Sequence, residues 1–199
     1  MRLLLQLDLE NLPAEFNGRL PDGLMQLFYC SVDDGRCDTW APFSGAQEIV
    51  FSPKGRPPPA ATPVTPLKLA PIQAWRRFED TPDPEEHGSL GVHYEYDYEA
   101  KRVHVTCDDP RIRLQNLDMA LNVAECVSAA ALGDKLGGWP YWIQGVEYPK
   151  CTECGTVMNL LVQIDSDDHL PYMFGDRGCA HLTYCPNHPR IMAFGWACG

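Results

Sequence analysis

Two stretches of the chain carry nearly the same pattern of apolar and polar positions. Residues 1–8, Met-Arg-Leu-Leu-Leu-Gln-Leu-Asp, match residues 158–165, Met-Asn-Leu-Leu-Val-Gln-Ile-Asp, without a gap. Each stretch is followed by a loop, an Asp-Gly or Asp-Arg-Gly turn and a second apolar run that ends in Tyr-Cys, at 22–30 and 176–185. Apolar and branched runs bounded by Gly, Pro and Asp are typical of strands. The pattern predicts an antiparallel β-ribbon in each copy and an internal duplication with pseudo-twofold symmetry.

The chain between the two copies changes character. Residues 53–71 hold seven prolines, which predicts an extended connection on the surface. Residues 72–78 and 92–106 alternate enough to predict strands on either side of an acidic turn at 80–86. From Asn116 to Leu132 apolar residues recur at helical spacing, which predicts one main helix.

These elements predict a β-rich α+β fold made of two related halves, each built on an antiparallel ribbon. The same pattern divides the chain into three sections. Residues 1–71 are the first repeat half, truncated at its N-terminus, with the proline-rich connection; residues 72–135 are the middle strands and helix; residues 136–199 are the second repeat half.

Composition and charge narrow the class of protein. Hydrophobic residues make up 45% of the chain, no stretch approaches the roughly 18 apolar residues of a membrane span, and Gln6 and Asp8 interrupt the apolar start before a secretory core forms. We therefore expect a cytoplasmic protein that binds no membrane. The formal net charge of −11, with no basic stripe, disfavours binding to nucleic acid, so we expect no nucleic-acid partner. Eight carboxylates and no Lys or Arg lie between Glu79 and Glu99, which is typical of a solvated acidic face; the alternative is a docking surface for a basic partner.

The spacing of cysteines indicates a metal site. The chain has nine cysteines, an odd number, and a core large enough to fold without a disulfide framework. Cys151 and Cys154 form a Cys-x2-Cys pair, and Cys185 and His188 form a Cys-x2-His pair. Two ligands from one tight loop can reach one ion, and two such loops complete a tetrahedral site. The alternative is a set of reduced cysteines in turns, with His188 on the surface.

The register of the second ribbon brings the two pairs together. If Ile164 lies opposite Asp176, Cys154 falls opposite Pro186, beside Cys185. Zinc is the predicted cofactor, because mixed thiolate and imidazole tetrahedra suit it. Four protein ligands leave no position for water or substrate, so the predicted role is structural and no catalytic residue is assigned. The sequence also lacks the P-loop, G-x-S-x-G, H-E-x-x-H and dinucleotide-binding signatures.

Two further features each have two interpretations. Gln6 and Gln163 hold matched positions in the two copies, and a polar residue inside an apolar strand usually satisfies buried backbone groups. The segment Gly137-Gly-Trp-Pro-Tyr-Trp142 predicts a corner that buries its Trp rings, or alternatively a peptide-binding surface.

Several motifs together resemble a known bacterial family. They are Leu136-Gly-Gly-Trp-Pro-Tyr-Trp-Ile-Gln144, Cys151-Thr-Glu-Cys-Gly-Thr-Val-Met158, Leu161-Val-Gln-Ile-Asp165, Gly175-Asp-Arg-Gly178 and Tyr184-Cys-Pro-Asn-His-Pro189. Over nearly its whole length the chain resembles the YwqG-like proteins, whose defining domain has no assigned function. A weaker similarity reaches the programmed cell death protein 2 family, which also has paired Cys-x2-Cys and Leu-Leu-Gln ribbons.

The resemblance implies protein binding. Members of the second family act as dedicated chaperones for a ribosomal protein, and some YwqG-like proteins lie beside toxin genes and are candidates for immunity proteins. We therefore expect a non-enzymatic protein-binding module with one structural zinc, whose partner is a protein, a basic protein being one candidate. The alternative is a hydrolase-like enzyme with a site in the cleft between the two halves.

The first copy departs from the family pattern. A Gly-Gly-x-Pro-x-Trp segment and a Cys-x2-Cys pair usually precede the first Leu-Leu-Gln strand, but here Met1 stands where Met158 stands in the second copy. Cys30 and Cys37 keep the downstream half of an equivalent metal site without its upstream ligands. We expect the reading frame to extend upstream, and we expect the exposed edge of this truncated ribbon to favour self-association.

Overall fold

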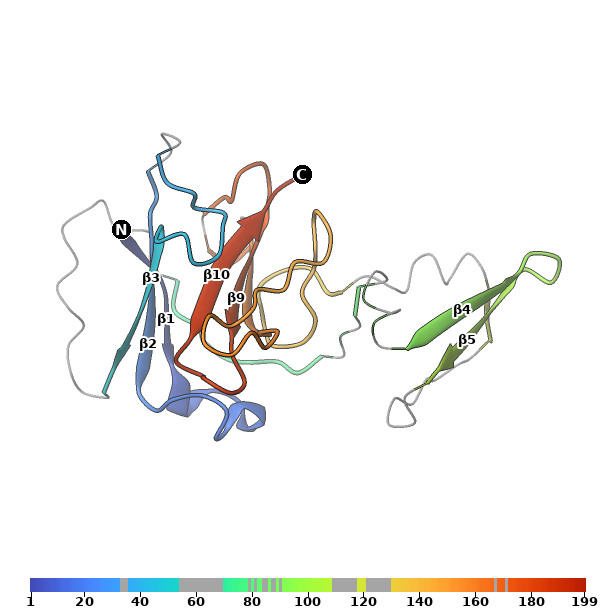
Figure 1. Cartoon of the computed structure of the whole chain (residues 1–199), viewed down its shortest axis with the longest axis horizontal. Helices are drawn as coiled ribbons and strands as arrows, with labels where there is room; N and C mark the ends of the chain where they lie inside the picture. The colour runs from blue at the N-terminus through green and yellow to red at the C-terminus, as the bar shows by residue number, and fades with distance from the viewer. Residues whose placement is uncertain are drawn as a thin grey trace.

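The fold is organised around two antiparallel sheets, with a third, smaller sheet beside them (Figure 1). This computed structural model describes residues 1–32, 36–53, 70–78, 80, 82–83, 86, 89, 91–108, 118–120, 130–166, 168–170 and 172–199. In these parts of the chain, no helix has the length and apolar character that crossing a membrane would require.

The first sheet contains the first predicted ribbon. Its strand order is β1 (Arg2–Asp8), β2 (Leu24–Tyr29) and β3 (Gln47–Ser52). Two 3-10 turns, η1 (Leu9–Asn11) and η2 (Ala14–Phe16), follow β1. The first turn begins directly after the strand because the Asp8 carboxylate accepts the backbone N–H of Glu10 and caps it.

The second sheet contains the second ribbon. Its order is β10 (Met192–Ala197), β9 (Cys179–Tyr184), β8 (Asn159–Asp165) and β7 (Lys135–Leu136). The β1–β2 and β8–β9 pairings have a register irregularity at the matching place, between Leu3 and Leu5 and between Leu160 and Val162. Both predicted ribbons are therefore present, and they share a local distortion of the kind that a β-bulge produces.

The main core lies between these two sheets. Tyr29 packs edge-on against Phe174 and Phe194, with ring centroids 6.1 and 5.6 Å apart. The Trp196 indole Nε1 donates to the Tyr29 hydroxyl at 2.9 Å, which joins the sheets through a polar contact as well. The buried aliphatic residues of this core come from both sheets and include Leu4, Leu7, Met25, Leu27, Leu161, Ile164 and Leu182.

The third sheet consists of β4 (Val92–Asp97), β5 (Arg102–Cys107) and β6 (Asp118–Ala120). Its β4–β5 hairpin projects away from the other two sheets (Figure 1). The strands predicted over 92–106 are confirmed, as two strands joined by a turn at 98–101.

The predicted main helix is wrong. Residues 118–120 form β6, which pairs with Arg102–His104 of β5, and residues 130–132 are not helical. Residues 116–117 and 121–129 of the predicted helix lie outside the described residues. Apolar side chains at helical spacing indicate only a weak preference for the helix, and at residues 118–120 pairing with β5 outweighs it. In the described residues, the helical elements with defined bounds are two short 3-10 turns, so the fold is β-rich without a main helix.

Two smaller predictions also need correction, and a third falls outside the structure. Residues 72–78 form no strand, because they line a cleft instead of pairing. Ile164 lies opposite Ala180 and not opposite Asp176, because residues 175–177 form a turn in which Arg177 has a positive φ of 55°. Of the proline-rich connection, residues 54–69 lie outside the described residues.

Candidate metal centre

The four predicted metal ligands lie together at one end of the second ribbon. Cys151 and Cys154 belong to the turn before β8, and Cys185 and His188 belong to the turn between β9 and β10. The β8–β9 pairing sets Asn159 opposite Tyr184, so the start of one strand meets the end of the other. The two turns face each other for this reason, although the register differs from the predicted one.

Each turn is closed by its own backbone hydrogen bonds. The N–H of Cys151 donates to the Thr156 carbonyl at 2.9 Å, and the N–H of Gly155 donates back to the Cys151 carbonyl at 2.9 Å. Gly155 has a φ of +69°, a conformation that glycine adopts without strain. In the second turn, the N–H of Cys185 donates to the Ile191 carbonyl at 3.0 Å. The backbone therefore fixes the direction of the ligand side chains before any ion binds.

The distances between the ligand atoms fit a tetrahedral ion. The Sγ atoms of Cys154 and Cys185 lie 3.7 Å apart, and Nδ1 of His188 lies 3.7 Å from Sγ of Cys151 and 3.9 Å from Sγ of Cys185. All four ligand atoms lie within 4.8 Å of one another. Zinc–sulfur bonds of about 2.3 Å at tetrahedral angles separate two sulfurs by about 3.8 Å. The cluster therefore has the dimensions of a four-coordinate site.

The electrostatics of the cluster favour the thiolate form at two of its three cysteines, Cys151 and Cys154. Contacts with the side chain and backbone of Thr156 lower the pKa of Cys154 to about 6. Burial alone would raise the pKa of Cys151, but hydrogen bonds from backbone N–H groups and from His188 outweigh it, so this pKa is lowered too. The neighbouring thiols raise the pKa of His188, whereas burial raises that of Cys185. Because the thiolate is the form that binds metals, the cluster can bind a metal ion.

The cluster also has a supporting layer. The buried residues Cys151, Met158, Cys185 and Ala193 form a small apolar core of their own. Asn187 Nδ2 donates to the Thr156 hydroxyl at 3.1 Å, so the two turns are connected beside the ligands. Such outer contacts hold ligands in place and are typical of structural metal sites.

The first ribbon carries a smaller cysteine pair. Cys30 follows β2 directly, and its Sγ lies 3.3 Å from Sγ of Cys37. Both residues are half-buried. Among the described residues, no third Cys, His, Asp or Glu joins them in a metal-binding group.

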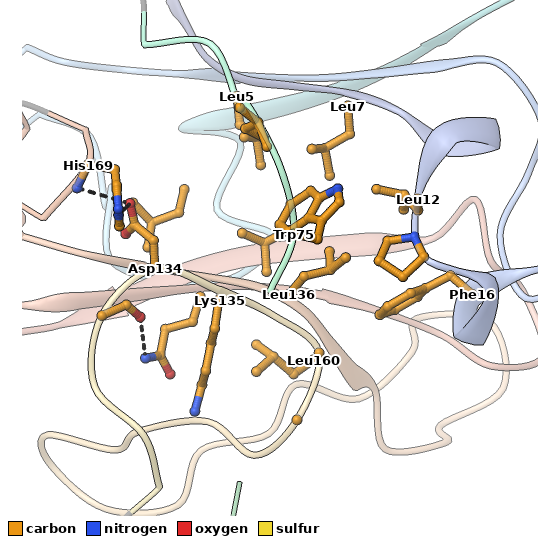
Figure 2. A pocket seen from close by; sticks show the side chains of 18 of the residues that line it. Leu5, Leu7, Leu12, Phe16, Trp75, Asp134, Lys135, Leu136, Leu160 and His169 are labelled. Atoms are coloured by element: carbon orange, nitrogen blue, oxygen red, sulfur yellow. Dashed lines mark hydrogen bonds and ion pairs between the residues drawn. The ribbon is translucent and has the colours of Figure 1, made fainter. Parts of the chain in front are cut away.

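A large cleft adjoins the metal centre. Its volume is about 2450 Å³, and it lies between β1, the segment at 70–78, and the β7–β8 part of the second sheet. Figure 2 shows apolar side chains around it, among them Leu5, Trp75 and Leu136. Met158 links the two sites, because it lines the cleft and belongs to the same small buried cluster as Cys151 and Cys185.

One end of the cleft is acidic. The carboxylate of Asp134 lies 3.2 Å from Nδ1 of His169, and the carboxylate of Asp168 lies 3.1 Å from the same atom. Burial raises the pKa of Asp134. No local sequence pattern indicates this group, because Asp134 lies more than thirty positions before Asp168 and His169 and meets them only through the β7–β8 pairing.

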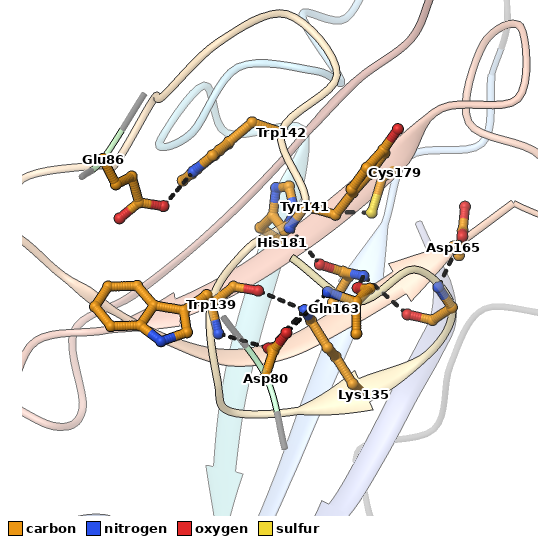
Figure 3. Close-up of polar contacts among 12 residues, drawn as sticks. Asp80, Glu86, Lys135, Trp139, Tyr141, Trp142, Gln163, Asp165, Cys179 and His181 are labelled. Atoms are coloured by element: carbon orange, nitrogen blue, oxygen red, sulfur yellow. Dashed lines mark hydrogen bonds and ion pairs between the residues drawn. The ribbon is translucent and has the colours of Figure 1, made fainter. Parts of the chain in front are cut away.

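A buried polar network lies around β7 and β8 of the second sheet, and several of its members also line the cleft (Figure 3). No local sequence pattern indicates most of it. The Asp80 carboxylate accepts hydrogen bonds from Lys135 Nζ and the Trp139 N–H, both at 2.9 Å. Lys135 also donates to the Trp139 carbonyl. Glu86 accepts from the Trp142 indole at 2.9 Å. These contacts attach the middle of the chain to the Gly-Gly-Trp-Pro segment.

The two matched glutamines behave differently. Gln163 is buried, accepts the N–H of Tyr141 at 2.8 Å and donates to the carbonyls of Ala131 and Gly133 at 3.1 and 2.9 Å. This confirms the prediction that it satisfies backbone groups. Gln6 is exposed, and its side chain accepts a hydrogen bond from Gln26 Nε2 at 2.9 Å. Within the described residues, Gln6 therefore does not satisfy backbone groups as Gln163 does.

Comparison with models of known protein families assigns the chain to one of them. The sequence model of a family described as "Domain of unknown function (DUF1963)" matches residues 1–186. The chain therefore belongs to the DUF1963 family. No curated protein and no solved structure matches the chain.

Proposed function

We propose that this protein is a non-enzymatic protein-binding module whose binding cleft is supported by a structural zinc ion. The observation that carries the proposal is the position of Met158, which lines the cleft and belongs to the same buried cluster as Cys151 and Cys185, two of the four candidate ligands. An ion at the cysteine cluster would fix this wall of the cleft.

Zinc is the proposed ion because of the donor set. Three thiolates and one imidazole at tetrahedral spacing suit zinc better than the oxygen-preferring cations. Four protein ligands complete its coordination, so the ion would stabilise the fold and would not activate water or substrate.

A protein is the proposed ligand because of the size and lining of the cleft. Pockets for small molecules usually measure about 300–1000 Å³, and this cleft is larger than that, at about 2450 Å³. Trp75 and Ile72 in its lining are 41% and 48% exposed, and exposed apolar side chains gathered in one place mark interaction sites. An immunity protein or a dedicated chaperone would each use such a cleft to hold its partner.

A capture experiment with matched variants tests the proposal. The full zinc-loaded chain, with Trp75→Ala and Trp40→Ala as variants, is used to capture proteins from the cells that produce it. Trp40 is 57% exposed and does not line the cleft, so it controls for loss of an exposed indole. We expect a partner that wild type and Trp40→Ala retain and that Trp75→Ala loses. Equal retention by all three chains, or no retained protein, would contradict the proposal.

A further inference from the structure

The two copies of the repeat differ at the outer edge of their first strand, which is β1 in the first sheet and β8 in the second. In the second sheet, β7 pairs with β8 through Lys135–Gln163 and Leu136–Val162, and the N–H of Gly137 donates to the Leu161 carbonyl at 2.8 Å. In the first sheet, β1 is the edge strand, and in the described residues no strand pairs with its other side. In the described residues, the outer edge of β8 therefore carries a strand and the outer edge of β1 does not.

This open edge faces the cleft. Every residue from Met1 to Asp8 lines it. An open edge presents unpaired N–H and C=O groups, which are a template for another strand. The Nε atom of Arg2 is also buried, and no group in the described part of the chain accepts a hydrogen bond from it, so β1 offers a side-chain donor as well.

The side chains around the cleft indicate the chemistry of such a strand. Leu5, Trp75, Leu136 and Leu160 form an apolar middle (Figure 2). Because alternate side chains of a strand point the same way, a bound strand would place every second residue against this surface. Aliphatic or aromatic residues at those positions would bury apolar area.

The charged residues at the ends of the cleft indicate where a basic side chain of the bound strand would lie. Asp134 and Asp168 share a single imidazole, that of His169, so this end of the cleft has more acid than base. The charge of the chain, −11, has the same sign. The apolar end, near Leu12 and Phe16, has the ion pair of Arg77 and Glu15 at 3.5 Å and also Arg19, whose N–H donates to the Phe16 carbonyl, so this end is not acidic. A Lys or Arg of the bound strand would therefore lie beside the two aspartates.

We infer that the cleft binds an extended peptide segment of a partner protein, which adds to β1 as a strand, packs alternate apolar side chains on Leu5, Trp75 and Leu136, and directs a basic side chain toward Asp134 and Asp168. The inference rests on the proposed function and names its partner class and binding mode. The mode is β-augmentation, in which main-chain hydrogen bonds supply affinity and side-chain pockets supply specificity.

A peptide library tests the inference directly. The library has the pattern Lys-x-Thr-x-Thr-x, where x is Leu, Ile, Val or Phe, and is screened against the zinc-loaded full chain by fluorescence anisotropy. We expect members that bind with a Kd below about 1 mM. Methylating the backbone nitrogens on the edge that faces β1 should weaken the best binder at least about tenfold, because main-chain hydrogen bonds are lost. Methylating the opposite edge should leave the Kd unchanged.

Two protein variants test the charge. Asp168→Asn should weaken binding of the Lys peptide severalfold at low salt and less at high salt, whereas Glu48→Gln, an exposed β3 residue outside the cleft lining, should not. No binder in the library, or equal Kd values for both methylated forms, would overturn strand addition. The capture experiment would still stand if Trp75→Ala loses a partner, so the two proposals fail separately. A dimer in sedimentation that dissociates when a library peptide is added would show that a second copy is the occupant of β1, and would overturn the inference of a different partner protein.

Discussion

The Asp80–Lys135 ion pair shows how much one residue contributes when it lies away from water. The two side chains are 7% and 1% exposed, and the charged atoms are 2.9 Å apart. Burial opposes ionisation of both groups, but hydrogen bonds from Ala131, Lys135 and Trp139 lower the pKa of Asp80 all the same. The carboxylate therefore depends on its donors.

Removing the lysine should be costly. Lys135→Met leaves a buried carboxylate without its counter-charge and should lower the free energy of unfolding by about 3–5 kcal/mol in urea titrations. The double variant Asp80→Asn, Lys135→Met should lose less than Lys135→Met alone, because no uncompensated charge remains. A double variant that is less stable than the single one would contradict this account of the pair.

His181 should make stability depend on pH. Burial, followed by the charge of Lys135, lowers its pKa from 6.5 to about 4. The unfolded chain therefore takes up a proton as the pH falls below 6.5, while the native chain does not until about pH 4, so stability is lost across this window. The loss is at most about 3 kcal/mol, at 1.36 kcal/mol per pKa unit.

Urea unfolding at pH 7 and pH 5 measures this dependence. The drop in stability should be smaller for His181→Gln than for wild type. His93→Gln, which changes an exposed histidine of β4, should retain the full drop. An equal drop in all three proteins would mean that His181 is not the group responsible.

At the scale of elements, the Asp-Gly turn before β2 should tolerate no side chain. Gly23 has a φ of +99°, and a Cβ there would lie 2.5 Å from the Ser52 carbonyl oxygen. Gly18 has a φ of +70° with nothing within 4 Å of its would-be Cβ, so it isolates the backbone effect. Gly18→Ala should cost about 1 kcal/mol and Gly23→Ala about 3 kcal/mol in chemical denaturation. Equal costs would show that the close approach of β3 has no effect.

The ribbons were predictable because their signal is local. Each carries alternating apolar residues, a turn signal and a Tyr-Cys end, and these lie within about 30 residues of one another in each copy. The register was predicted wrongly, because Ile164 was set opposite Asp176, which lies in the turn at 175–177, whereas its partner in the strand is Ala180. The predicted helix failed for a related reason, since residues 118–120 pair with β5 and distant partners decide strand pairing.

At the scale of the whole molecule, the residues of the candidate metal cluster were predictable and the residues that line the cleft were not. Two short spacings, Cys-x2-Cys and Cys-x2-His, identified all four residues of the cluster, because each pair lies in one turn. The cleft is built from β1, residues 70–78 and the β7–β8 region, which are distant in sequence. Its walls meet only after the two sheets have packed on their shared core.

Zinc should hold the second half of the molecule together. Four ligands from two turns join the start of β8 to the β9–β10 connection, so loss of the ion should loosen the wall that Met158 forms. We expect chelation to lower the melting temperature of wild type. Cys154→Ser should melt at the temperature of the chelated protein and should not respond to chelator.

Native mass spectrometry of protein purified without chelator measures whether the cysteine cluster holds zinc. We expect one zinc ion per wild-type chain and no zinc in Cys154→Ser, with one zinc retained in Cys37→Ser, which changes a cysteine outside the cluster. Wild-type protein that carries no metal, or that carries zinc which Cys154→Ser retains, would contradict the proposed zinc site.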